Sequence, residues 1–156
     1  MTRDAVPAPN TRPWYAVDLD KTLAEYHGEK QSLHIGPPIP RMLARVKAML
    51  AEGKDVRIFT ARVDGGDVAL AMGDPAGAEY RDVAAIRAAI EAWCLEHVGQ
   101  VLPITNVKDY GLEELWDDKA IQVIPNTGVR ADGTDGDWLP PTPRDLARVF
   151  GSGLER

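Results

Sequence analysis

The chain has 156 residues, with 24 acidic and 18 basic side chains and a formal net charge of -6. This length fits one domain, and the negative charge argues against duplex nucleic acid as a partner. The single cysteine, Cys94, excludes an internal disulfide. No apolar run approaches the ~18 residues of a membrane span, and the first ten residues lack the apolar stretch of a signal peptide. We therefore expect a cytoplasmic protein that makes no membrane contact.

The first half of the chain predicts a strand, a helix and a second strand. The apolar run at residues 14–17 (WYAV) precedes a loop that contains several glycines and prolines. A helix that Gly53 closes should follow, because apolar residues recur there at helical spacing, at Met42, Leu43, Val46, Met49 and Leu50. Residues 55–59 (DVRIF) predict the second strand, and residues 63–78 a Gly- and Asp-rich loop.

The second half continues the alternation. Val83, Ile86, Ile90 and Trp93 repeat at helical spacing in an Ala-rich stretch that ends near Gly99. Further short strands are predicted at residues 100–105, 114–116 and 120–124, and a closing helix at residues 143–150. Parallel strands need crossover connections, so this order indicates an α/β fold whose central parallel sheet is covered on both faces.

Polar side chains follow four of these strands. In open α/β sheets, ligands bind outside the carboxyl ends of the strands. The residues at these positions are Asp18 and Asp20, Thr60, Lys108, and the pair Asp117 and Asp118. Each alone has a plain structural explanation, as a turn, a helix cap, a strand-end hydroxyl or a solvated surface charge. Their joint occurrence at strand ends favours a shared site.

These residues resemble the motifs of the haloacid dehalogenase superfamily. Residues 14–24 (WYAVDLDKTLA) resemble its first motif, residues 56–62 (VRIFTAR) its second, Lys108 its third and residues 114–121 (ELWDDKAI) its acidic fourth. Lys21 stands where the family frequently has glycine. Lys108 lies close in sequence to the acidic pair, which leaves Lys119 as a second claimant for the lysine role.

The resemblance implies a Rossmann-like three-layer sandwich. We expect a single domain over residues 1–156, with a core at about 14–124 and a C-terminal loop and helix at 125–156. Neither interval in which family members carry a cap has room for a large cap domain. Only a short flap at residues 23–39 or the 63–78 loop remains to cover the site.

The carboxylates suit phosphoryl transfer. Asp18 is the expected nucleophile, which would form an aspartyl-phosphate. Asp20 would protonate the leaving oxygen and then activate water. Thr22 would hold the active loop at the substrate, and Thr60 would hydrogen-bond a phosphoryl oxygen. Lys108 would neutralise developing charge, and Arg62 is a candidate substrate contact or a simple surface charge.

Mg²⁺ is the expected cofactor, since it prefers carboxylate, water and phosphate oxygens. The resemblance implies Asp18 and Asp118 as direct ligands, with the backbone carbonyl of Asp20. Asp117 would hold a bound water.

These residues predict a Mg²⁺-dependent phosphomonoester hydrolase. Its substrate would be a phosphorylated small molecule such as a nucleotide, or an exposed phosphate on a macromolecule such as a polynucleotide end. A non-catalytic phosphate- or metal-binding module remains an alternative. A receiver-like phosphorylation switch fits less well. In receivers the acidic pair precedes the lysine in sequence, whereas here the pair Asp117 and Asp118 follows Lys108.

Overall fold

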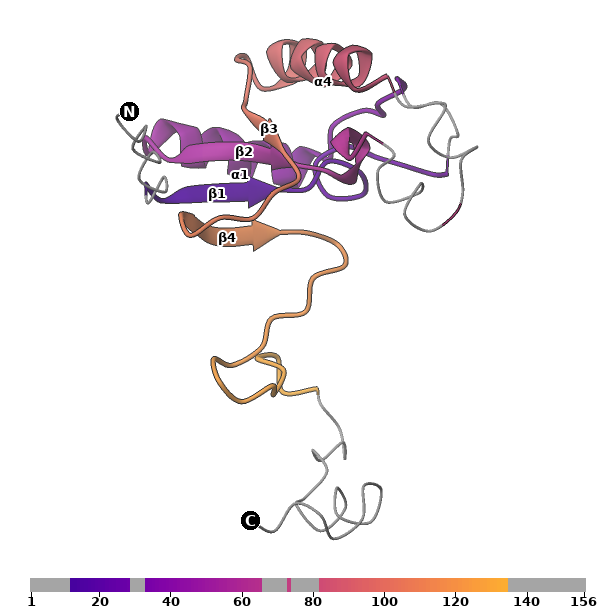
Figure 1. The fold of residues 1–156 in the computed structure, drawn as a ribbon. Coiled ribbons are helices and arrows are strands. Elements are labelled where there is room, and N and C mark those ends of the chain that lie inside the picture. Colours follow the sequence, from indigo (N-terminus) through magenta and orange to yellow (C-terminus); the bar gives the residue numbers. More distant parts are fainter. Residues whose placement is uncertain (1–11, 29–32, 66–72, 74–81, 135–156) are drawn as a thin grey trace, which may run out of the picture. The chain divides into compact units, whose positions relative to one another are not determined.

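The computed structural model describes residues 12–28, 33–65, 73 and 82–134. The chain divides into two compact units, Met1–Ala120 and Ile121–Arg156. The first unit contains a four-stranded parallel sheet with the order β3-β2-β1-β4 (Figure 1). Its strands are β1 (Trp14–Val17), β2 (Asp55–Phe59), β3 (Ile104–Thr105) and β4 (Leu112–Trp116). The α/β class with a parallel sheet is confirmed, although β3 is shorter than the strand predicted at residues 100–105.

Two α-helices and one short 3-10 helix are described. Helix α1 (Pro40–Ala51) begins with a proline, whose missing N–H is harmless at a helix start. Helix α4 (Val83–His97) begins at Asp82, whose carboxylate accepts a hydrogen bond of 3.0 Å from the Ala85 N–H. Both helices lie where the apolar spacing predicts them. Among the described residues, no helix is long and apolar enough to cross a membrane.

Both helices pack on one face of the sheet. The chain moves from β1 to the adjacent β2 and then to the adjacent β3, and right-handed crossovers in one direction place their helices on the same side. Val17, Val56 and Ile58 point to this side and share one core cluster with the buried residues of both helices, namely Met42, Val46 and Met49 with Ile86, Ile90, Trp93 and Cys94.

The opposite face is covered differently. Trp14 is fully buried there, with the Arg57 guanidinium 4.7 Å from its ring centroid and its Nε1 donating to Asp109 Oδ1 at 2.7 Å. Asp109 belongs to residues 106–111, which connect β3 directly to β4 without a helix. A helical layer on this face is therefore not among the described elements, and the three-layer sandwich is not confirmed.

The second unit differs from the strand predicted at its start. Residues 120–124 form no strand, so that prediction is wrong. Val123 instead makes an isolated antiparallel bridge with Arg130 around a turn in which Asn126 has a φ of 65°. This local hairpin satisfies backbone groups, as in the 2.8 Å bond from Ile124 N–H to the Val129 carbonyl. The helix predicted at residues 143–150, like most of the 63–78 loop, lies outside the described residues.

Candidate functional site

The acidic residues predicted at the ends of β1 and β4 meet at one point of the sheet. From β1 the chain proceeds to β2 on one side, whereas β4 pairs with β1 on the other. Ligands of open α/β sheets bind at such a switch point, outside the carboxyl ends of the strands. The Asp18 N–H donates to the Trp116 carbonyl at 2.9 Å, which joins the two strand ends directly.

Asp18, Asp117 and Asp118 form an acidic cluster at this point. One carboxylate oxygen from each lies within 4.8 Å of the others. Burial is the largest cause that raises the pKa of Asp18 from 3.8 to about 7, and the charge of Asp117 is the next. The charges of Asp118 and Asp20 act in the same direction, and only the hydrogen bond from the Leu19 N–H opposes them. The carboxylates of the cluster therefore repel one another, and a bound cation or a proton would reduce this repulsion.

The chemistry of this cluster fits a hard divalent cation. Its donors are carboxylate oxygens, Asp18 and Asp117 are half-buried, and Asp118 is exposed to solvent. Mg²⁺ is held in proteins by a few carboxylates and keeps several of its waters. An exposed carboxylate beside two half-buried ones leaves room for such waters. The predicted contribution of the Asp20 carbonyl stays a prediction.

Asp20 is held apart from the cluster by Arg62. The guanidinium donates from Nη2 to Oδ1 at 2.6 Å and from Nε to Oδ2 at 2.7 Å, so both carboxylate oxygens are occupied. Arg62 also donates from Nη1 to the His34 carbonyl at 2.8 Å. One side chain thus connects the loops after β1 and β2 with the segment before α1.

This ion pair was not predicted from the sequence, although a signal for it exists. Asp20 and Arg62 stand at comparable positions, three residues past the last residue of the adjacent strands β1 and β2. Two opposite charges in neighbouring loops at the same edge of a parallel sheet are within reach of each other.

Thr60 holds the backbone of Arg62 in place. Its side chain is 2% exposed, and its Oγ1 accepts a hydrogen bond of 3.2 Å from the Arg62 N–H. This contact caps the 3-10 helix η1 (Ala61–Val63). The Thr60 N–H donates to the Thr105 carbonyl at 3.0 Å, which fixes the end of β2 against β3. Because a hydroxyl also carries one donor, this contact leaves the hydroxyl hydrogen of Thr60 available.

Thr22 and Lys21 shape the loop after β1. The Thr22 hydroxyl donates to Asp18 Oδ2 at 3.4 Å, so it lies beside the predicted nucleophile. Lys21 has a φ of 67°, a conformation that favours glycine, and its N–H donates to the Ala24 carbonyl at 2.8 Å. This departure from the family motif therefore falls at a left-handed position of the turn.

Lys108 is not joined to the acidic cluster. It is exposed in the connection between β3 and β4, and among the described residues it makes no hydrogen bond or ion pair. Its neighbour Asp109 is anchored to Trp14, which starts β1, whereas Asp18 follows the end of that strand. Those two positions are about 13 Å apart at the usual rise of a strand. Lys119 contributes its backbone N–H to Asp117 Oδ1 at 2.6 Å.

The site thus combines the half-buried carboxylate of Asp18, the carboxylate of Asp20 paired with Arg62, and the hydroxyls of Thr22 and Thr60. No family model, curated protein or solved structure matches this chain.

Proposed function

We propose that this protein is a Mg²⁺-dependent phosphomonoester hydrolase that works through an aspartyl-phosphate on Asp18. The observation that carries the proposal is the meeting of Asp18, Asp117 and Asp118 within 4.8 Å at the switch point of a parallel sheet. A nucleophile and metal ligands are needed at the same place in this chemistry, and the cluster offers both.

Asp18 and Asp118 would hold Mg²⁺ directly, with Asp117 through a water. When bound, the cation would supply charge neutralisation for the phosphoryl oxygens and keep Asp18 ionised. The raised pKa of Asp18, about 7, supports this assignment, since a carboxylate among like charges gains most from a cation.

In the first step the Asp18 carboxylate oxygen forms a bond to phosphorus as the bond from phosphorus to the leaving oxygen breaks. Asp20 would first take up a proton from solvent, then give it to that oxygen and become a carboxylate again. In the second step Asp20 takes a proton from water, whose oxygen bonds to phosphorus and releases Asp18 with inorganic phosphate. For this role Asp20 must leave its ion pair with Arg62, and an anionic substrate that engages Arg62 would favour that exchange.

The remaining residues would bind the phosphoryl group. Thr60 offers the hydroxyl hydrogen that its contact with Arg62 leaves available, and Thr22 keeps the Asp18 carboxylate oriented. Lys108 would have to approach from the connection between β3 and β4, and its role stays a prediction. The substrate class is a phosphorylated small molecule, or an exposed phosphate on a macromolecule.

Phosphate release tests the proposal. Wild-type protein should release phosphate from nucleotides, sugar phosphates or phosphorylated oligonucleotide ends in Mg²⁺ but not in EDTA. Asp18→Asn should abolish release, whereas Asp20→Asn should lose less on nitrophenyl phosphate, a good leaving group, than on alkyl phosphates. Glu113→Gln, which changes an exposed residue of β4, is the matched control. Equal losses for both leaving groups in Asp20→Asn would refute the division of roles.

A non-catalytic phosphate-binding module is the second candidate. The ion pair that occupies both oxygens of Asp20 favours it. Such a module would bind phosphate with Mg²⁺ yet release none from any ester.

A further inference from the structure

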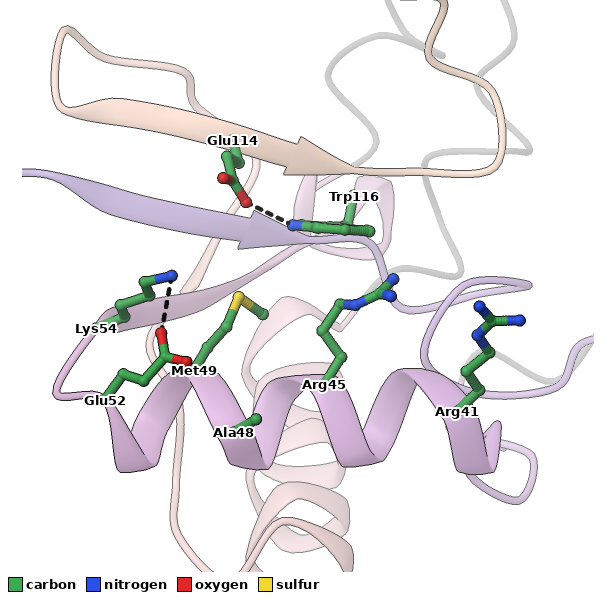
Figure 2. A pocket seen from close by; sticks show the side chains of 8 residues that line it. All are labelled: Arg41, Arg45, Ala48, Met49, Glu52, Lys54, Glu114 and Trp116. Carbon is green, nitrogen blue, oxygen red and sulfur yellow. Dashed lines mark hydrogen bonds and ion pairs between the residues drawn. The ribbon is translucent and has the colours of Figure 1, made fainter.

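A second feature of the first unit lies beside the candidate active site. A groove of about 470 Å³ runs between helix α1 and strand β4 (Figure 2). We define the arginine groove by the charged and aromatic side chains that line it: Arg41, Arg45, Glu52, Lys54, Glu114 and Trp116. Three of these are cationic, in a chain whose net charge is -6.

The charges of the groove are separated along its length. Figure 2 shows Lys54 and Glu52 together towards the end of α1, where they form an ion pair of 3.0 Å. Glu114 accepts a hydrogen bond of 3.1 Å from Trp116 Nε1. Arg41 lies at the start of the helix and Arg45 near its middle, and within the described residues neither has an ion pair or a hydrogen bond. The two groove cations without an ion pair among the described residues are therefore Arg41 and Arg45.

Arg45 is held in place without using its donors. Its guanidinium carbon lies 4.2 Å from the centroid of the Trp116 ring. Stacking on an aromatic face fixes a guanidinium while its N–H groups stay available in the plane. Arg41 is one helical turn before Arg45, so both side chains leave the same face of α1. A preorganised arginine with a second one beside it is suited to a phosphate.

This end of the groove adjoins the acidic cluster. Trp116 is the last residue of β4 and directly precedes Asp117. Its carbonyl accepts the 2.9 Å hydrogen bond from the Asp18 N–H. The residue on which Arg45 stacks is therefore hydrogen-bonded through its backbone to Asp18, the proposed site of the first phosphate.

We propose that the arginine groove binds a second phosphate of the substrate, so that the preferred substrate is a phosphomonoester that carries another phosphate nearby. This proposal rests on the proposed function, because it assigns the first phosphate to Asp18. Two kinds of ligand carry a phosphomonoester beside another phosphate: a nucleoside bisphosphate and the phosphorylated end of a single-stranded oligonucleotide.

Calorimetric titration with Ca²⁺ in place of Mg²⁺ tests this proposal, because Ca²⁺ also takes carboxylate ligands and neutralises the acidic cluster, whereas the proposed hydrolysis requires Mg²⁺. Wild-type protein should bind thymidine 3′,5′-bisphosphate at least about tenfold more tightly than thymidine 5′-monophosphate. Arg45→Gln and Arg41→Gln should each reduce that preference to below about threefold. Lys47→Gln removes the same charge from an exposed position of α1 that does not line the groove, and should keep the preference.

A 5′-phosphorylated oligothymidylate distinguishes these two kinds of ligand. If the oligothymidylate binds more tightly than the bisphosphate and its affinity falls steeply with salt concentration, the ligand is a strand end. If the two affinities are equal, the ligand is the small bisphosphate. Equal affinity of wild-type protein for the mono- and bisphosphate overturns the groove assignment, as does an equal loss in Lys47→Gln and Arg45→Gln. If the preference depends on Arg45 but no phosphomonoester is hydrolysed in Mg²⁺, the groove stands and the proposed hydrolase function fails.

Discussion

Asp18 should make the stability of the metal-free protein fall as the pH rises. Its pKa is about 7 in the folded protein, against 3.8 as the ordinary value. Between these values the unfolded chain is ionised while the folded protein keeps its proton, so the free energy of unfolding declines through this window. Urea unfolding in EDTA from about pH 4 to about pH 8 measures the slope. Asp18→Asn, which cannot ionise, should flatten it; an unchanged slope would contradict the assignment.

Asp118 should decide how strongly Mg²⁺ stabilises the fold. A ligand that binds only the folded protein raises its melting temperature by mass action. Asp118→Asn removes one of the clustered carboxylates and should abolish most of that rise. Glu113→Gln removes an exposed charge from β4 and should keep it. Thermal unfolding with and without Mg²⁺ gives the comparison, and an undiminished rise in Asp118→Asn would exclude this residue as a ligand.

Arg62 should stabilise the fold as well as bind substrate. Its ion pair with Asp20 connects residues far apart in sequence, and the two side chains are only 12% and 26% exposed. Arg62→Gln should lower the free energy of unfolding by about 1–3 kcal/mol, because a partly buried carboxylate loses its partner.

A double-mutant cycle with Asp20→Asn isolates this coupling. The ion pair between Arg130 and Asp132 has similar chemistry but is more exposed, so Arg130→Gln should cost less than about 1 kcal/mol. Additive losses in Asp20→Asn and Arg62→Gln would show that the pair contributes nothing measurable.

The segment before α1 depends on a close backbone approach at Gly36. A Cβ atom there would overlap the Glu25 carbonyl oxygen. The Gly36 carbonyl also accepts a hydrogen bond of 2.9 Å from Trp93 Nε1 of α4. Gly36→Ala should therefore destabilise the protein by about 3 kcal/mol in urea unfolding. Gly99→Ala meets no atom within 4 Å and strains only its φ of 93°, so it should cost about 1 kcal/mol. Similar losses for both variants would contradict the steric argument.

The elements were predictable where periodicity was strong. Helix α1 and helix α4 bury the apolar positions that their spacing predicts, and β1 and β2 match their apolar runs. The strand expected at residues 120–124 did not form, since those apolar residues pair only locally, around a turn. Residues 100–105 pair only at Ile104 and Thr105, because β3 meets just the carboxyl end of β2.

Side-chain partners were harder to predict than elements. The cluster of Asp18, Asp117 and Asp118 was predictable because strand ends converge in a parallel sheet. The pair of Asp20 and Arg62 depends on loop conformations that no periodicity encodes. Lys108 was assigned from its order in the motifs, whereas its position depends on how Asp109 anchors the connection to Trp14.

Across the whole molecule, the strand order accounts for where the candidate chemistry lies. Helices α1 and α4 form two crossover connections that lead the chain across the sheet in one direction, from β1 to β2 and then to β3. The connection from β3 to β4 then returns the chain to the other side of β1. As a result of this reversal, the carboxyl ends of β1 and β4 lie beside both the acidic cluster and the arginine groove. The proposed substrate with two phosphates would use both surfaces of this edge.

Trapping a phosphoryl mimic on Asp18 tests the central proposal most directly. Trifluoroberyllate binds carboxylates as a phosphoryl group would, so fluorine NMR with Mg²⁺ should show bound signals in the wild type and in Asp20→Asn but none in Asp18→Asn. A crystal structure of the adduct should place beryllium on Asp18, near Thr60. Beryllium on Asp20, or no adduct in wild-type protein that has bound Mg²⁺, would contradict the aspartyl-phosphate mechanism.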